Sequence, residues 1–304
     1  MIEILVLYAL FASTFTLGTE VVRFVPPVFF IGIRMILGGL LLLGFVKFWK
    51  HEHFRFPKKE WPWFVGIIFF HIFFAYCFEF TSMKYLTSSK VSLLYNLSPF
   101  ITALFAYFCF NEVMTPKKWL GLGIGFAGFF PLLYATAPAE ELALGSLGFV
   151  SFAELIALAS VVSSCAGWIF MQKLTRDHQH SYFFVNGVGM LGGGILALIT
   201  SYQFEVWPEW QALSTNFVFW RCLFLLILIG NVICFNLYGK LLHKYSATIL
   251  SFFGFFTPLF SAIFGWYWLG ETVSNVFFIT TFLVTFGLYL FYQEELRQGY
   301  ILDS

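Results

Sequence analysis

Ten stretches of apolar residues, each long enough for a membrane-spanning helix, constrain this chain more than any other feature. A helix needs about 20 consecutive apolar residues to cross the hydrocarbon core of a bilayer. The stretches lie at 3–22, 27–47, 62–82, 88–110, 117–135, 148–171, 182–202, 217–239, 247–268 and 274–292. Barrel strands would instead alternate apolar and polar residues over about 10 positions. The sequence therefore predicts an all-α integral membrane protein with ten transmembrane helices.

The composition supports a surface that faces lipid. Of 304 residues, 60% are hydrophobic and only 11% are charged, whereas soluble domains carry about 25% charged residues. A net charge of +1 argues against a nucleic-acid partner, because phosphate binding needs a concentrated basic face. All five cysteines lie in apolar runs without CxxC spacing, which indicates buried thiols and no metal site: Cys77, Cys109, Cys165, Cys222 and Cys234.

Basic residues predict the orientation. With a cytoplasmic N-terminus, the inside segments hold twelve lysines and arginines: Lys47, Lys50, Arg55, Lys58, Lys59, Lys117, Lys118, Lys173, Arg176, Lys240, Lys244 and Arg297. The outside loops hold four: Arg23, Lys84, Lys90 and Arg221. Cytoplasmic loops carry an excess of Lys and Arg. Both termini are therefore predicted to be cytoplasmic, with the protein in the cell inner (cytoplasmic) membrane.

An internal repeat is visible in the apolar segments. Pro99 and Glu112 lie thirteen residues apart in the first half, and Pro258 and Glu271 lie thirteen apart in the second. A chance match of two Pro–Glu pairs is the alternative explanation. The order, the spacing and the number of segments agree, however, which favours a true repeat.

The repeat predicts two halves of five helices each, at 1–140 and 141–304. Because five is odd, the second half enters the membrane in the opposite direction. Inverted-topology repeats are typical of secondary transporters, which bind substrate between the repeats near the middle of the membrane.

At these residues the sequence resembles the drug/metabolite transporter superfamily, in particular its ten-helix group with two EamA-type repeats. The resemblance rests on Arg34 in the second apolar segment and on the twin Pro…Glu helices that end at Glu112 and Glu271. It covers essentially the whole chain and implies a transporter rather than an enzyme. Known members move amino acids, nucleotide-related metabolites, sugar-phosphate-like compounds or drugs. The second copy departs from the pattern, since Gly189 of GMLGGG stands where the first copy has Arg34 of RMILGG.

Ionisable residues within the apolar segments are candidates for the substrate site, because burying charge in hydrocarbon costs several kcal/mol. Glu79 and His71 are eight residues apart, so a helix places them near one face. Glu20 and Glu154 add two acids, and a cavity lined by carboxylates favours a cationic substrate or protons. Alternatively, Glu20 reaches the interface, Glu154 lies too near the outer end of its span, and His71 is a packing residue.

The two mid-segment prolines are predicted to kink their helices and serve in gating. Pro99 and Pro258 each remove a backbone hydrogen bond. Beside them, Tyr95 and Asn96 in the first half and Phe255 in the second are predicted to contact substrate.

Further candidates are an aromatic and an amide. Trp168 could form a wall for a planar ring, although aromatic residues are abundant enough for packing to explain it. Asn236 needs a partner on a neighbouring helix or a ligand. Three charged residues are assigned to ion pairs or caps: Arg34, Glu112 and Glu271. For Arg34, binding of a carboxylate is the alternative.

Two G-x-G-x-x-G matches, at 123–128 and 187–192, lie inside apolar segments and do not follow strands. They are better interpreted as small-residue surfaces for helix packing. No Walker motif is present, which excludes ATP-driven transport by this chain alone, and no cofactor is expected.

The leading hypothesis is a secondary transporter that works by alternating access and acts as a monomer or homodimer. Several acids and many aromatic residues favour a zwitterionic or cationic amino-acid derivative, such as one of the S-adenosylmethionine kind, or an ordinary amino acid. The alternatives are a broad-specificity drug/metabolite exporter, a lipid scramblase or an intramembrane lipid enzyme. The enzyme is disfavoured because the only aspartates, Asp177 and Asp303, lie outside the apolar segments.

Overall fold

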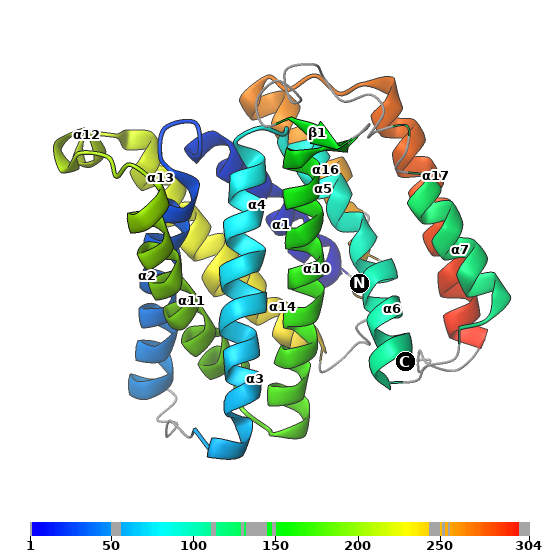
Figure 1. Ribbon diagram of the computed structural model, residues 1–304, viewed down its shortest axis with the longest axis horizontal. Coiled ribbons are helices and arrows are strands. Elements are labelled where there is room, and N and C mark those ends of the chain that lie inside the picture. The colour runs from blue at the N-terminus through cyan, green and yellow to red at the C-terminus, as the bar shows by residue number, and fades with distance from the viewer. Residues whose placement is uncertain are drawn as a thin grey trace. The chain divides into compact units, whose positions relative to one another are not determined.

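The computed structural model describes residues 2–49, 56–110, 114–128, 131, 145–147, 150–242, 250, 253–254 and 256–297. Phe255 and Glu112 lie outside these residues. The regular secondary structure of the described residues is helical (Figure 1) apart from the antiparallel pair β1 (Ser146–Leu147) and β2 (Val150–Ser151), in which Ser146 faces Ser151. The all-α prediction is confirmed.

The helices of the first half include two runs with changes of helix type. They are α1 (Ile2–Val21), α2 (Pro27–Phe48), η1 (Lys58–Glu60), α3 (Trp61–Gly66), η2 (Ile67–Phe74), α4 (Ala75–Met83), α5 (Ser88–Leu94), η3 (Tyr95–Leu97), α6 (Ser98–Phe110) and α7 (Pro116–Ala127). The segments η1 and η3 are 3₁₀ helices, whereas η2 is a π-helix.

In the described residues of the second half, three segments are π-helical: η4, η5 and η6. Its helices are α10 (Phe152–Gln172), η4 (Lys173–Asp177), α11 (Tyr182–Phe204), α12 (Trp210–Ser214), α13 (Phe217–Leu225), η5 (Leu226–Cys234), α14 (Phe235–Leu242), α16 (Phe256–Phe264), η6 (Gly265–Leu269) and α17 (Asn275–Arg297).

Seven helical runs in the described chain are long and apolar enough to cross a bilayer: Ile2–Val21, Pro27–Phe48, Lys58–Met83, Phe152–Thr175, Tyr182–Phe204, Phe217–Leu241 and Asn275–Glu294. Each coincides with one of the expected segments. The three remaining segments contain the shorter helices α5 to α6, α7, and α16 with η6. The chain is thus a multi-pass helical membrane protein.

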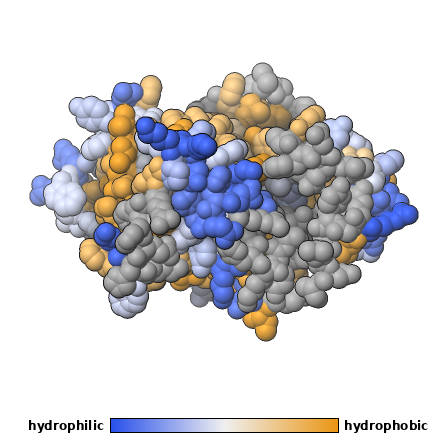
Figure 2. All heavy atoms as spheres, turned by 90° about the horizontal axis from the view of Figure 1, so that it is seen from below, coloured by the Kyte–Doolittle hydropathy of each residue, from blue (hydrophilic) through white to orange (hydrophobic). Residues whose placement is uncertain are grey.

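Exposed apolar side chains mark the lipid-facing surfaces. On α2, Leu40 and Leu41 are more than half exposed, whereas Arg34 on the same helix is 1% exposed. A helix that buries its charge and exposes its leucines is arranged for an apolar solvent. Figure 2 shows hydrophilic side chains gathered on the end seen from below, where α3 begins in Figure 1.

The chain forms two compact units, and each draws on both halves of the sequence. Unit 1 comprises Met1–Thr16, Tyr85–Val161 and Leu241–Ser304; unit 2 comprises Leu17–Lys84 and Val162–Lys240. The helices α1 and α10 each contribute to both units. Sequence halves and compact units are therefore different divisions of this chain.

Glycines allow the closest helix contacts in both units. In unit 2, α2 and α11 run side by side (Figure 1), and a Cβ added at Gly39 would lie 2.7 Å from the Leu191 nitrogen. In unit 1, a Cβ added at Gly121 of α7 would lie 2.7 Å from the carbonyl oxygen of Gly287 on α17. Small residues let helix backbones approach in this way, which fits membrane helix packing.

Glu205 closes the N-terminus of α2 from the end of α11. Its Oε1 and Oε2 accept hydrogen bonds from the Val28 and Phe29 nitrogens at 3.1 and 2.8 Å. The Ser201 hydroxyl holds the carboxylate at 2.7 Å. These backbone N–H groups have no partner inside their own helix, and a carboxylate also complements the helix dipole.

We expect Glu205→Ala to lower the free energy of unfolding by about 1.5–3 kcal/mol, the usual contribution of a hydrogen bond to a charged group. Thermal unfolding in detergent would measure the loss. Glu209→Ala is the matched control, because Glu209 is exposed and its side chain makes no cap hydrogen bond to α12. Equal melting temperatures for the two variants would contradict the proposed cap.

Candidate functional site

The structure divides the predicted site residues between the two units. Unit 2 holds Glu20, Arg34, His71, Glu79, Trp168 and Asn236. Unit 1 holds Tyr95, Asn96, Pro99, Glu154, Pro258 and Glu271. Each group is described within its own unit.

Five rings form an aromatic cluster in unit 2. We define it as His71, Tyr76, Trp168, Phe235 and Tyr238. Trp168 lies at its centre, with ring centroids 4.5 Å from His71, 6.2 Å from Phe235 and 4.2 Å from Tyr238. Tyr76 extends the cluster from Phe235 at 5.8 Å. The members come from three helical runs, so they meet only in the folded unit.

Within the aromatic cluster, His71 has buried polar atoms without hydrogen bonds to the described residues. Its side chain is 2% exposed, and neither ring nitrogen has a hydrogen-bond partner among the described residues. It lies on the π-helical segment η2, and π-helical insertions are frequent at functional sites. A buried imidazole without hydrogen bonds costs stability, and a neutral one offers one donor and one acceptor to a ligand.

A guanidinium is held beside the aromatic cluster. Arg34 is 1% exposed, and its Nε donates to Oδ1 of Asn231 at 2.8 Å. Its Cζ lies 5.5 Å from the centroid of the Tyr76 ring and 5.4 Å from that of Phe80. Within the described part of the chain, its Nη1 has no hydrogen-bond partner.

Asn231 is oriented by two sulfur atoms and lies on another π-helical segment, η5. Its Nδ2 donates to the Sδ atoms of Met35 and Met190 at 3.3 and 3.5 Å. This direction of the amide leaves its oxygen facing Arg34. Nothing in the sequence connects Asn231 with an arginine 197 residues away.

Two further predicted residues of unit 2, Glu79 and Asn236, are buried. Glu79 on α4 is 6% exposed and precedes Phe80, whose ring lies against the guanidinium of Arg34. Asn236 donates to the Val232 carbonyl at 2.7 Å and accepts from Asn186 at 3.4 Å.

Glu20 forms an ion pair with Arg221 and accepts a hydrogen bond from the Cys222 thiol at 3.7 Å. Both charged side chains of this pair are partly exposed. The environment of Glu20 therefore differs from that of the buried Glu79.

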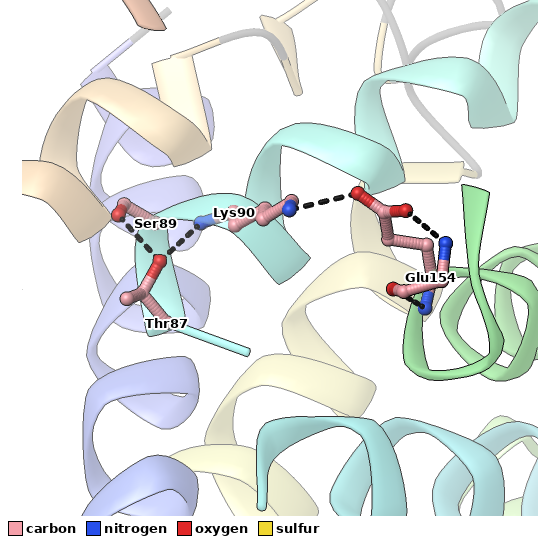
Figure 3. A network of polar contacts seen from close by, with 5 residues as sticks. Thr87, Ser89, Lys90 and Glu154 are labelled. Atoms are coloured by element: carbon pink, nitrogen blue, oxygen red, sulfur yellow. Dashed lines mark hydrogen bonds and ion pairs between the residues drawn. The ribbon is translucent and has the colours of Figure 1, made fainter. Parts of the chain in front are cut away.

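In unit 1, Glu154 binds Lys90 in a buried ion pair (Figure 3). The Nζ–Oε1 distance is 2.7 Å, and the side chains are 9% and 0% exposed. Ser151 and Glu154 form a reciprocal cap at the start of α10: the Ser151 nitrogen donates to Oε2 at 2.7 Å, and the Glu154 nitrogen donates to the Ser151 hydroxyl at 3.2 Å. Lys90, counted as an outside-loop residue from the sequence, is buried in this pair.

Tyr95 and Asn96 lie on the 3₁₀ segment η3 of unit 1. The Tyr95 hydroxyl is 2.7 Å from that of Ser160, and its ring meets Phe15 edge to face at 5.3 Å. Asn96 is 3% exposed, and its Nδ2 has no partner among the residues that the structure describes. Pro99 follows as the second residue of α6, so the change of helix type precedes the proline.

Glu271 caps α5, which also belongs to unit 1. It accepts hydrogen bonds from the Ser88 nitrogen at 3.0 Å and from the Ser88 hydroxyl at 2.8 Å. The backbone turns at Gly270 with φ +66°, a conformation that favours glycine. Pro258 is the third residue of α16.

Sequence reasoning assigned no role to Tyr76 and missed two further members of the aromatic cluster, Phe235 and Tyr238. With Asn231 they follow a spacing of four and three residues, which places all three near one face of a helix. That spacing was the available signal. Its weakness is that 44 phenylalanines and 14 tyrosines produce many such patterns.

The helical fold buries polar groups among lipid-facing helices, an arrangement that is typical of membrane transport proteins. A family model described as the EamA-like transporter family matches residues 1–134 and 151–293. The chain belongs to this family, which confirms the resemblance inferred from Arg34 and the Pro…Glu helices. It is accordingly a transporter and not an enzyme.

Curated relatives extend over nearly the whole chain. A protein of Chlamydia muridarum named S-adenosylmethionine/S-adenosylhomocysteine transporter is 33% identical over 297 residues, covering 97% of this chain and 92% of that protein. A protein of the same name from Chlamydia trachomatis serovar D is 32% identical over 297 residues, covering 97% of this chain and 89% of its own. An uncharacterized transporter of Bacillus subtilis is 26% identical, covering 81% of this chain and 76% of its own.

A solved structure supports the fold. A crystal structure whose title does not name the protein aligns with this chain with a TM-score of 0.63 at 20% identity. The alignment covers 98% of this chain and 96% of the other chain. At this identity the likeness concerns the fold alone.

Proposed function

We propose that this protein transports S-adenosylmethionine and S-adenosylhomocysteine across the cell inner membrane. The observation that carries the proposal is the 33% identity, over 97% of this chain, to a transporter named for these two compounds. Such a substrate also agrees with the zwitterionic or cationic amino-acid derivative expected from the sequence.

The aromatic cluster suits the adenine ring and the sulfonium group of such a substrate. Aromatic rings such as those of Trp168 and Tyr238 are able to stack on adenine, and their faces attract a positive sulfonium. His71 offers the edge of the base two nitrogens that have no hydrogen-bond partner among the described residues. We assign Glu79, His71, Trp168 and Asn236 to the substrate site in unit 2; Tyr95, Asn96, Glu20 and Glu154 stay predictions from the sequence.

We propose that transport uses alternating access between two five-helix inverted repeats, residues 1–140 and 141–304. The double match of the family model supports this division. So do the π-helical segments η2 and η5, which fall in the third expected helix of each half. The excess of basic residues in the inside segments supports cytoplasmic termini.

The test is uptake of radiolabelled S-adenosylmethionine by proteoliposomes that contain the purified protein. Uptake is expected to saturate and to be inhibited by unlabelled S-adenosylhomocysteine. Base-to-aromatic stacking contributes about 1–3 kcal/mol per base. Trp168→Ala should therefore reduce apparent affinity roughly ten- to hundredfold, whereas Trp168→Phe should retain most of it.

Trp210→Ala is the matched control, because Trp210 belongs to the same unit and is 70% exposed. Unchanged uptake by Trp168→Ala would remove the aromatic cluster from the site. Equal inhibition by unrelated cationic drugs would indicate a broad-specificity exporter. Lack of saturable uptake would overturn the proposed substrate.

A further inference from the structure

Arg34 is fixed in place yet incompletely bound. Asn231 accepts from its Nε, and the rings of Tyr76 and Phe80 flank its guanidinium. Its Nη1 has no partner among the described residues although the side chain is 1% exposed. Burial of a cation in an apolar helix is costly. The immobilised guanidinium with an unoccupied donor group is the arrangement expected of a ligand-binding residue.

The chemistry of the unoccupied donor group defines its ligand. A guanidinium binds carboxylates through short, charge-assisted hydrogen bonds. Glu79 is buried on α4 and lies in sequence between Tyr76 and Phe80, whose rings flank the guanidinium of Arg34. A buried cation and anion in one unit match the two charges of an α-amino acid head, which carries a carboxylate and an ammonium group.

We propose that Arg34 binds the α-carboxylate of the substrate and Glu79 its α-ammonium group, with Asn231 as the positioning residue for Arg34. This inference rests on the proposed function and specifies which end of the substrate each group recognises. Tyr76 connects the two ends, since its ring lies against both the guanidinium and Phe235 of the aromatic cluster. The amino-acid head thus lies at Arg34, and the adenosyl part lies at Trp168.

Recognition of the head by Arg34 predicts a specific order of affinities. S-adenosylmethionine and S-adenosylhomocysteine share the head, so both depend on Arg34 equally. The decarboxylated analogue of S-adenosylmethionine retains the amine and the adenosyl part but has no carboxylate. A charge-assisted contact corresponds to about a ten- to hundredfold change in affinity, so the analogue should bind that much more weakly than S-adenosylmethionine.

The experiment measures competition by both compounds against labelled S-adenosylhomocysteine bound to the purified full-length protein. In Arg34→Gln, the affinity for S-adenosylmethionine should fall about ten- to hundredfold, while that for the decarboxylated analogue stays the same. The preference between the two compounds therefore disappears. Glu79→Gln should weaken both compounds, because both carry the amine, and should leave the preference in place.

Asn231→Ser tests the positioning role and serves as the second variant if Arg34→Gln does not fold. This variant keeps the guanidinium of Arg34 but replaces the side chain that accepts its hydrogen bond by a shorter one. The preference for S-adenosylmethionine over the decarboxylated analogue should therefore become smaller. An unchanged preference in Arg34→Gln, or in Asn231→Ser if only that variant folds, would overturn the assignment of Arg34. If the unmodified protein does not bind S-adenosylmethionine at all, the proposed function falls, and this assignment falls with it.

Discussion

Substitution of Gly39 by valine is expected to prevent accumulation of folded protein. A Cβ at this position would lie 2.7 Å from the Leu191 nitrogen and 2.9 Å from the Gly187 carbonyl oxygen. Both obstacles are backbone atoms of α11, so a change of side-chain rotamer cannot relieve the clash. The two helices would have to separate along their whole contact. This contact is a large part of the helix packing within unit 2.

Overpacking of a core by extra methyl groups usually costs about 1–3 kcal/mol. At Gly39 the cost should exceed this range, because two backbones must move. Size-exclusion chromatography and thermal unfolding in detergent would measure the effect. Gly44→Val is the matched control: it lies on the same helix, and an added Cβ there meets no atom within 4 Å. Similar elution and melting of the two variants would refute the close contact between α2 and α11.

Glu154→Gln is expected to have the second largest effect, a loss of about 3–5 kcal/mol in the free energy of unfolding. The glutamine retains an oxygen for the Ser151 nitrogen, so the start of α10 keeps its cap. Lys90 loses the charge of its partner while it stays buried, and an uncompensated buried charge is strongly destabilising. Thermal and denaturant unfolding of the purified protein would give the loss.

Two comparisons make the Glu154 prediction specific. Lys90→Met combined with Glu154→Gln should recover most of the stability, because neither charge then remains buried. Asp177→Asn breaks a second pair with the same 2.7 Å separation, Lys173–Asp177, whose side chains are 40% and 49% exposed. Exposed pairs contribute about 0–1 kcal/mol. Equal losses in Glu154→Gln and Asp177→Asn would contradict the buried pair.

The class of fold was predictable because it depends on local composition. A stretch of about 20 apolar residues can satisfy its backbone only as a helix in lipid. This requirement involves no distant part of the chain, and seven of the predicted segments are continuous helical runs in the structure. Family membership could also be inferred, since Arg34 and the repeated Pro…Glu spacing are properties of the sequence itself.

The candidate site was only partly predictable. His71 and Trp168 were each named from the sequence, and the structure brings their rings to 4.5 Å. Phe235 and Tyr238 could not be distinguished from the many aromatic residues that pack against lipid or other helices. Their membership of the aromatic cluster depends on which helix face meets which neighbour, and hydrophobic periodicity is too weak to decide this in a segment that is apolar on all sides.

The sequence by itself determined that this is an all-helical membrane protein of the EamA-like transporter family. Tertiary structure decided which buried charges have partners: Lys90 with Glu154, and Arg34 with Asn231. The physical reason is that a charge in an apolar segment must find a counter-charge, a dipole or a ligand, but its identity depends on long-range packing. Only the folded chain reveals that the Arg34 guanidinium is held by Asn231 while its Nη1 has no partner among the described residues.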